Sequence, residues 1–178
     1  MTSSVSCQRK IGESICMDIS PDRSSVVIGS ASGQLCVVSI DSNYQLKRLE
    51  VIETDEEKLN GTKMEDDEDA HPIEVVKFWQ NTSTTLGQLF IAGSLNGFVY
   101  VYENTGKLRL KLLHPDGVNG LIFAPGDVPR FVSACFDGRL RIWDCRNGQP
   151  LCELAGHKVR HSLSFESYIK YTFAGSYS

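Results

Sequence analysis

Four histidines are the side chains of this sequence best suited to acid–base chemistry or to metal binding. Three of them, His71, His114 and His157, recur 43 residues apart, and the fourth is His161. A catalytic site needs different residue types that converge once, whereas one residue type at a constant interval indicates a structural repeat. The sequence also lacks the G-x-S-x-G and G-x-x-x-x-G-K-[ST] motifs of hydrolases and phosphate-binding loops. We therefore predict that the protein is not an enzyme.

The cysteines and the densest acidic run do not have the spacing of metal ligands. No two of the six cysteines form a C-x-x-C pair, which structural zinc sites usually contain. Residues 65–69 are acidic but lack the alternating ligands and glycine of a calcium loop. We predict neither a metal nor a cofactor. Cys36, Cys135 and Cys152 lie in alternating apolar runs and are expected to be buried free thiols, which favours a reducing compartment, the cytoplasm or alternatively the nucleus.

Three stretches of the chain share one pattern, which indicates an internal repeat. Residues 26–40, 89–103 and 131–145 each contain an apolar run, a small residue, a glycine four positions later and a second alternating run. The small residues are Gly29, Gly93 and Ala134, at intervals of 64 and 41, and Gly175 follows Ala134 by another 41. A period of about 40–45 residues is typical of the four-stranded blades of β-propellers.

Alternating apolar residues and turn dipeptides predict four short strands in each repeat. Asn96-Gly97 and Asp137-Gly138 are strong hairpin signals, because both residue types tolerate the positive φ of tight turns. First strands are expected near 15–19, 73–79, 118–123 and 161–165, and second strands near 25–30, 88–93, 130–135 and 171–175. Third strands are expected near 34–39, 97–102 and 139–144, and fourth strands near 46–52, 107–113 and 150–154. The fold class is therefore all-β.

The longer first interval is explained by an acidic insert between two blades. Residues 50–70 contain ten acidic residues and two lysines, so their net charge is −8 within a chain of net charge −4. Such a segment should be solvated. We predict blades at 13–52, 73–113 and 118–154, an incomplete blade at 157–178, a disordered insert at 53–70, and a disordered N-terminus or incoming strand at 1–12.

Two dipeptides, Trp143-Asp144 and Gly156-His157, make the sequence resemble the WD-repeat β-propellers. In that family a well-formed repeat contains a buried hydrogen-bonded chain of a histidine, a serine or threonine, the aspartate of a turn and a tryptophan. The resemblance assigns these roles in the third repeat to His114, Ser133, Asp137 and Trp143. The second repeat has Asn96 and Tyr102 in place of the aspartate and tryptophan, and the first has Ser32 and Val38. The resemblance supports the fold but does not indicate one function.

Four stretches in order resemble the C-terminal half of the angio-associated migratory cell protein family. They are SPDRSSVVIGSASGQLCV, the acidic insert, AGSLNGFVYVYE and CFDGRLRIWDCRNGQPLCELAGH, and the similarity covers about residues 13–176. The resemblance implies a non-enzymatic adaptor. In the yeast branch of the family it implies a chaperone of one basic large-subunit ribosomal protein, bound on a propeller face.

Partner-binding residues are expected where turns and incoming loops gather on one face of a propeller. Leu95, Asn96, Asp116 and Phe136 are predicted there, and exposed apolar residues among them would suit binding anchors. The alternative is that Leu95 and Phe136 only pack between blades. Four acidic residues of the insert, Asp66, Asp67, Glu68 and Asp69, could attract a basic protein, or the insert could have no function.

The composition and the number of repeats limit the remaining possibilities. The net charge of −4 gives no basic field for nucleic acid, and no apolar run is long enough to span a membrane. About three and a half blades do not close a ring of seven or eight, so the chain is expected to be a fragment of a longer propeller, or to pair edge to edge with a second copy. The alternatives to a ribosomal chaperone are a general scaffold in signalling or cell migration, a non-functional truncated propeller and, remotely, an enzyme.

Overall fold

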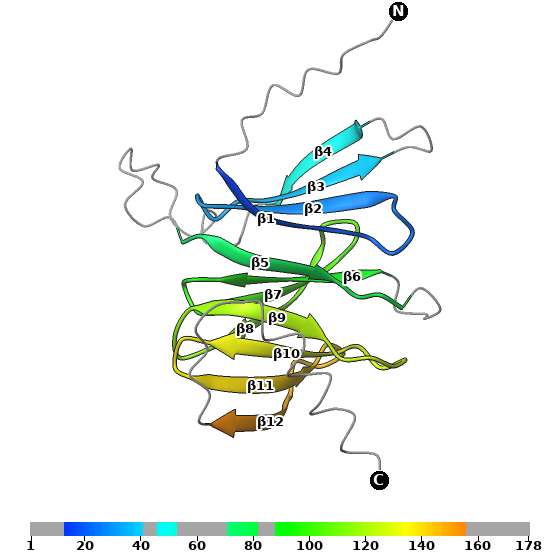
Figure 1. The fold of residues 1–178 in the computed structure, drawn as a ribbon. Helices are drawn as coiled ribbons and strands as arrows, with labels where there is room; N and C mark the ends of the chain where they lie inside the picture. The colour runs from blue at the N-terminus through cyan, green and yellow to red at the C-terminus, as the bar shows by residue number, and fades with distance from the viewer. Residues whose placement is uncertain (1–12, 41–45, 53–70, 82–87, 156–178) are drawn as a thin grey trace, which may run out of the picture.

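The computed structural model describes residues 13–40, 46–52, 71–81 and 88–155. These residues form three antiparallel four-stranded sheets in which each strand pairs with the next along the chain (Figure 1). Blade 1 consists of β1 (Ser14–Ile19), β2 (Ser25–Ser30), β3 (Leu35–Ile40) and β4 (Leu46–Ile52). Blade 2 consists of β5 (Ile73–Phe78), β6 (Leu89–Ser94), β7 (Phe98–Glu103) and β8 (Leu108–Leu113). Blade 3 consists of β9 (Val118–Phe123), β10 (Arg130–Cys135), β11 (Arg139–Asp144) and β12 (Pro150–Ala155).

The all-β prediction is confirmed, and the twelve strands begin and end within about one residue of their predicted limits. The described residues contain strands and turns and no helix. No helix in this part of the chain could therefore cross a membrane. The predicted strands near 161–165 and 171–175, the fourth blade at 157–178, the N-terminal segment 1–12 and the insert at 53–70 lie outside the described residues.

The hairpin between the second and third strands of each blade turns on one glycine. Gly33, Gly97 and Gly138 have φ of 79°, 84° and 80°, values that a residue without a Cβ adopts at little cost. The preceding Asn96 and Asp137 do not share the positive φ. Their side-chain oxygens instead accept hydrogen bonds from the backbone N–H groups of Phe98 (3.1 Å) and Arg139 (3.0 Å). The turn dipeptides were thus predicted correctly. Only the glycine adopts the positive φ, whereas the residue before it accepts a hydrogen bond from the backbone.

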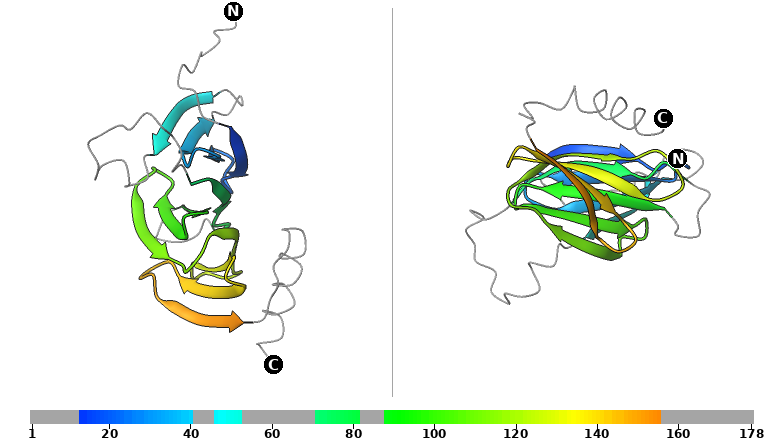
Figure 2. Two further views of the ribbon diagram at one scale, coloured as in Figure 1. Left: turned by 90° about the vertical axis from the view of Figure 1, so that its left-hand side faces the viewer. Right: turned by 90° about the horizontal axis from the view of Figure 1, so that it is seen from below.

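The three blades stack face to face and fan out from their first strands (Figures 1 and 2). β1 contacts β5, and β5 contacts β9, so neighbouring blades contact each other through their first strands. One apolar core lies between blades 1 and 2 and contains Val27, Leu35, Val76, Phe78 and Phe90. A second core lies between blades 2 and 3. It contains Trp79, Ile91, Leu121, Phe131 and Trp143. Each sheet therefore depends on its neighbour to bury an apolar face.

The outer strands of blades 2 and 3 use different chemistry at matching positions of the register. Tyr100 pairs with Lys111 in blade 2, and Arg141 pairs with Glu153 in blade 3. The Lys111 ammonium lies 4.1 Å from the centroid of the Phe98 ring, a cation–π contact. In blade 3 the Arg141 guanidinium forms an ion pair with Glu153 at 3.0 Å. Blades 2 and 3 therefore have the same backbone pairing at this position but different side-chain contacts.

Two of the three cysteines expected to be buried are buried. Cys36 and Cys135 are enclosed, but Cys152 is exposed, because β12 is the outer edge strand of the described sheet of blade 3. The prediction was therefore wrong for Cys152. Cys145, which the sequence pattern did not single out, lies in the core between blades 2 and 3. Burial raises the pKa of its thiol to about 12, which keeps it protonated.

Candidate protein-binding face

The hairpin turns and the loops that enter each blade lie on one side of the stack. In each blade the residue after the second strand donates its backbone N–H to a residue just before the first strand. Ala31 donates to Glu13 (2.7 Å), Leu95 to Pro72 (3.0 Å) and Phe136 to Gly117 (2.9 Å). We call the surface formed by Ala31, Leu95, Asn96, Asp116 and Phe136 the loop face. Its position follows from the repeated antiparallel hairpins.

Three of the predicted partner-binding residues lie together on the loop face around Gly117. A Cβ added to Gly117 would lie 3.0 Å from the Leu95 carbonyl oxygen and 3.0 Å from Cδ2 of Phe136, so a larger residue would force these neighbours to shift. Phe136 is 53% exposed, Leu95 is half-buried and Asp116 is exposed. A phenylalanine that is half exposed beside a carboxylate offers an apolar anchor with a charged neighbour.

Asn96 has a different environment from the other three predicted residues. Its Oδ1 accepts the Phe98 N–H, and its Nδ2 donates to the Tyr100 hydroxyl at 3.4 Å. The Asn96 amide therefore forms hydrogen bonds with residues of the hairpin that contains it. The acidic residues Asp66, Asp67, Glu68 and Asp69 lie outside the described residues. The segment that contains them joins β4 to β5, and both flanking positions, Ile52 and Ile73, are at the loop-face end of their strands, since they pair with Leu35 and Ser94.

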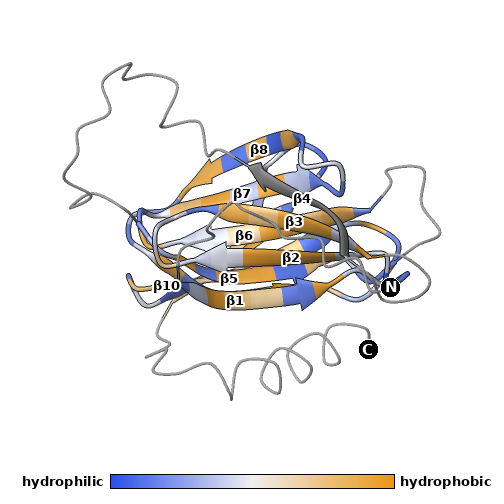
Figure 3. Ribbon diagram, turned by 90° about the horizontal axis from the view of Figure 1, so that it is seen from above, coloured by the Kyte–Doolittle hydropathy of each residue, from blue (hydrophilic) through white to orange (hydrophobic). Residues whose placement is uncertain are grey.

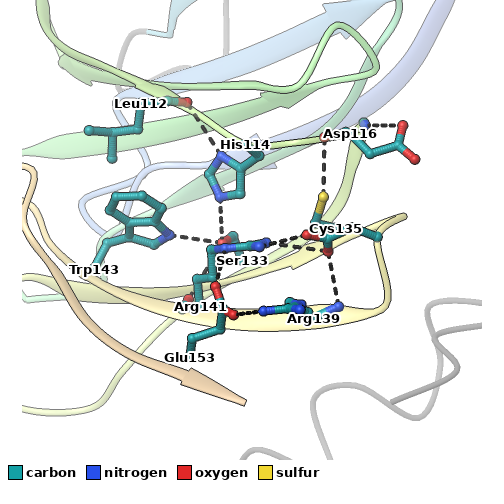
Figure 4. A network of polar contacts seen from close by, with 11 residues as sticks. Leu112, His114, Asp116, Ser133, Cys135, Arg139, Arg141, Trp143 and Glu153 are labelled. Atoms are coloured by element: carbon teal, nitrogen blue, oxygen red, sulfur yellow. Dashed lines mark hydrogen bonds and ion pairs between the residues drawn. The ribbon is translucent and has the colours of Figure 1, made fainter. Parts of the chain in front are cut away.

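A buried hydrogen-bonded chain supports the loop face from below (Figure 4). Nε2 of His114 lies 2.8 Å from Oγ of Ser133, and the Trp143 indole N–H donates to the same Oγ at 2.9 Å. All three residues are at most 7% exposed. The backbone N–H of His114 donates to Gly97 at 2.7 Å, which ties the chain to the hairpin turn of blade 2. Of the four residues assigned by the resemblance, these three are brought together.

Asp137, the fourth residue, is paired with an arginine instead of the histidine. Its carboxylate accepts hydrogen bonds from Nη2 (2.6 Å) and Nη1 (3.3 Å) of Arg141. These bonds lower the pKa of Asp137 to about 2. The remaining ring nitrogen of His114, Nδ1, lies 3.4 Å from the Leu112 carbonyl oxygen. The neutral imidazole with its proton on Nδ1 satisfies both contacts, with the Ser133 hydroxyl donating to Nε2.

Arg141 was not singled out from the sequence, where it appears only as a polar residue of an alternating strand. In the structure it is 7% exposed and also pairs with Glu153, which in turn contacts Arg139. These four side chains form a line of alternating charge, from Asp137 to Arg139, at the edge of blade 3. The repeat did contain evidence that Arg141 would be buried, because Arg141 occupies the position in blade 3 at which blade 2 has the buried Tyr100. A charge at a buried register position needs a partner.

Lowering the pH from 7 to 5 should reduce the free energy of unfolding by about 2 kcal/mol through His114. Burial lowers the pKa of this imidazole from 6.5 to about 4. Between these values the unfolded chain binds a proton that the folded chain excludes, so the contribution is complete above pH 6.5 and is lost as the pH falls toward 4. Urea unfolding at pH 7, 6 and 5 measures the slope. His114→Gln should have lower stability but a flatter dependence over this range, and an equal slope in both proteins would contradict the assignment.

In the described part of the chain, the loop face is a surface that could contact another protein. Among the described residues there is no group of three or more histidine, cysteine, aspartate or glutamate side chains that could hold a metal ion. His114, Ser133 and Arg141, which are buried, each have a hydrogen-bond or ion-pair partner, and the exposed residues of the loop face are Asp116 and Phe136. Such a surface can bind a polypeptide.

Comparisons with known proteins agree with this architecture. Residues 106–144 match the family model of the WD domain, G-beta repeat. A WD repeat-containing protein of Schizosaccharomyces pombe is 27% identical over 142 residues, which are 79% of this chain and 30% of that protein. The WD repeat and SOCS box-containing protein 1 of Danio rerio is 38% identical over 84 residues, which are 45% of this chain and 20% of that protein.

Solved structures show the same fold at low sequence identity. The WD40 repeats of RRP9 superpose with a TM-score of 0.64 at 16% identity, over 85% of this chain and 41% of that one. Saccharomyces cerevisiae Sqt1 superposes with a TM-score of 0.60 at 23% identity, over 81% of this chain and 36% of that one. The chain thus spans less than half the length of each of these relatives. Residues 106–144 are similar to a WD repeat, and the three described sheets have the fold of part of a WD40 β-propeller.

Proposed function

We propose that the chain is a non-enzymatic adaptor that binds a basic protein on the loop face. The observation that carries this proposal is Phe136, which is 53% exposed at the blade 3 end of the loop face, above residues that form buried hydrogen bonds. Side chains of this kind contribute most of the binding energy in protein interfaces. Gly117 and the buried His114–Ser133–Trp143 chain hold the backbone on both sides of it. A rigid support reduces the entropy lost on binding.

The charge near the loop face suits a basic partner. Asp116 is exposed beside Phe136, and the segment 53–70, which joins two strands at this face, contains nine acidic residues and two lysines. A concentrated negative charge accelerates the association of positively charged proteins and is screened by salt. The resemblance to the angio-associated migratory cell protein family suggests a client, a basic large-subunit ribosomal protein that the chain would protect before assembly. The proposed place of action is the cytoplasm, or alternatively the nucleus.

Replacing Phe136 with alanine should weaken binding of the client by at least tenfold, because an anchor at the centre of an interface typically contributes 2 kcal/mol or more. The test incubates the immobilised 178-residue chain with purified large-subunit ribosomal proteins and identifies those retained. Leu151→Ala is the matched control, since Leu151 is 48% exposed and lies beside Pro150, which pairs with Trp143 at the end of blade 3 away from the loop face.

Replacing the nine acidic residues of segment 53–70 with the corresponding amides, Glu→Gln and Asp→Asn, tests the charge separately and keeps the full length of the connection between β4 and β5. We expect this variant to bind the client more slowly and with a weaker dependence on salt. Retention of no ribosomal protein by the unaltered chain would overturn the chaperone role and favour a general scaffold. Equal retention by the Phe136→Ala variant would overturn the loop face as the site.

A further inference from the structure

Three groups that attract a cation surround Gly117 on the loop face. The Leu95 carbonyl oxygen and Cδ2 of the Phe136 ring each lie 3.0 Å from the place that a Gly117 Cβ would take. The Asp116 carboxylate is held beside them, because its Oδ1 accepts the Gly117 N–H at 2.7 Å. Among the described residues no donor bonds to the Leu95 carbonyl oxygen. A carbonyl oxygen, a carboxylate and the face of an aromatic ring thus lie around one Cα atom, and all three interact favourably with positive charge.

The hairpin of blade 3 is joined to the loop before β9 at two consecutive residues, which fixes these groups in place. The Phe136 N–H donates to the Gly117 carbonyl oxygen at 2.9 Å, and the Cys135 thiol donates to the Asp116 carbonyl oxygen at 3.2 Å. Strands such as β2 and β3 consist mainly of hydrophobic residues (Figure 3), and several of these lie in the core between blades. The loops and turns therefore present the polar groups that a partner can reach.

The arginines that follow the hairpin turn of blade 3 do not neutralise Asp116. Arg141 pairs with Asp137 and with Glu153, and Arg139 pairs with Glu153. Asp116 forms no ion pair with any residue that the structure describes. In Figure 4 its carboxylate points away from Arg141. The exposed Asp116 carboxylate is therefore available to a cation from another molecule.

We infer that this part of the loop face binds an arginine side chain of the partner, an inference that rests on the proposed function. The guanidinium group stacks on the exposed part of the Phe136 ring and donates hydrogen bonds to the Asp116 carboxylate and the Leu95 carbonyl oxygen. A guanidinium is planar and has five N–H donors, so it can stack on a ring and serve two acceptors at once. A lysine ammonium is a compact, strongly hydrated charge and binds such an arrangement less tightly.

Titration of the isotope-labelled 178-residue chain with the peptide acetyl-Gly-Arg-Gly-amide, followed by nuclear magnetic resonance, tests the inference. The guanidinium is the only charge of this peptide, so the signals that shift locate the site that binds it. We expect the backbone signals of Gly117 and Phe136 to shift. The peptide with citrulline in place of arginine has nearly the same shape but no charge, and it should bind about tenfold more weakly or less. The peptide with lysine should also bind more weakly than the arginine peptide.

Two substitutions test the carboxylate and the ring separately. Asp116→Asn removes the charge but keeps an oxygen for the Gly117 N–H, and it should weaken binding of the arginine peptide by about tenfold. Phe136→Leu keeps an apolar side chain without a ring and should weaken it by about two- to fivefold. Asp127→Asn is the matched control for the charge. Asp127 is also exposed and accepts a hydrogen bond, from Asn81, but it lies between β9 and β10, at the opposite end of the blades. Circular dichroism verifies that each variant is folded.

The peptide titration and the retention of ribosomal proteins can fail independently. If the chain retains ribosomal proteins but the arginine peptide does not shift the loop-face signals, the arginine site is wrong and the adaptor role stands. If the peptide binds as expected but no ribosomal protein is retained, the arginine site stands and the chaperone role is wrong. The arginine site is also refuted if the citrulline or lysine peptide binds as tightly as the arginine peptide, or if Asp116→Asn has no more effect than Asp127→Asn.

Discussion

Replacing Trp143 with alanine should reduce the free energy of unfolding by about 3–5 kcal/mol, the typical cost of removing a large buried aromatic side chain. Trp143 is 7% exposed, stacks against Phe131 with ring centroids 6.4 Å apart, and lies in the core between blades 2 and 3. The substitution would open a cavity and leave the Ser133 hydroxyl without its indole donor. Since folded domains are stable by about 5–15 kcal/mol, the variant should be close to unfolding at 25 °C.

Urea denaturation measures this loss. The fluorescence of Trp79, the other of the two tryptophans, remains as a probe in the variant. Trp143→Phe is the control, because it retains an aromatic ring in the core but lacks the indole N–H. Its loss should be smaller, about 1–2 kcal/mol, mainly from the hydrogen bond to Ser133. A loss below 1 kcal/mol for Trp143→Ala would show that blade 3 does not depend on this core.

Replacing Arg141 with methionine should cost about 2–3 kcal/mol. The guanidinium pairs with Asp137 at 2.6 Å and with Glu153 at 3.0 Å, and only 9% of its side chain is exposed. Methionine fills a similar volume but leaves the Asp137 carboxylate without its main partner. Removing one member of a fully buried ion pair costs more, but Asp137 is 17% exposed and water can partly replace the arginine.

Urea unfolding at neutral pH measures the effect, and Arg139→Met is its matched control. Arg139 pairs with the same Glu153, but both side chains are about half exposed, so its loss should stay within about 0.5–1 kcal/mol. In the double variant Asp137→Asn, Arg141→Met the total loss should be smaller than the sum of the single losses, since no unpaired charge remains. Additive losses would show that the two residues do not interact.

The strands, turns and repeat could be predicted from sequence because they depend on local patterns. Alternation in residues 139–144 and the glycine at 138 determine a strand and its turn whatever the rest of the chain does. The pairing of Ser133 with His114 and Trp143 was suggested by a resemblance and not by the pattern. The partner of Asp137 depends on which of several donors reaches it. His114 and Arg141 were both available in the sequence, and only the packed structure shows that the arginine occupies this place.

Exposure was the property that sequence patterns predicted least well. Cys152 has the same alternating surroundings as Cys135, but the two differ in burial because β12 is an outer strand and β10 an inner one. Met17, Val76 and Leu121 have similar local patterns, and their different exposure depends on what lies across the sheet. Strand position and neighbouring layers are determined by long-range contacts, which alternation in the sequence does not specify.

The exchange between Lys111 and Glu153 at matching register positions has a consequence for how such repeats can diverge. The Lys111 site in blade 2 rests on aromatic rings, and the Glu153 site in blade 3 rests on guanidinium groups. The charge of an outer strand can thus be reversed, provided that the adjacent strand changes with it, while the backbone ladder stays the same. A duplicated unit is therefore free to acquire its own electrostatic surface, two positions at a time, without losing the shape that lets it stack.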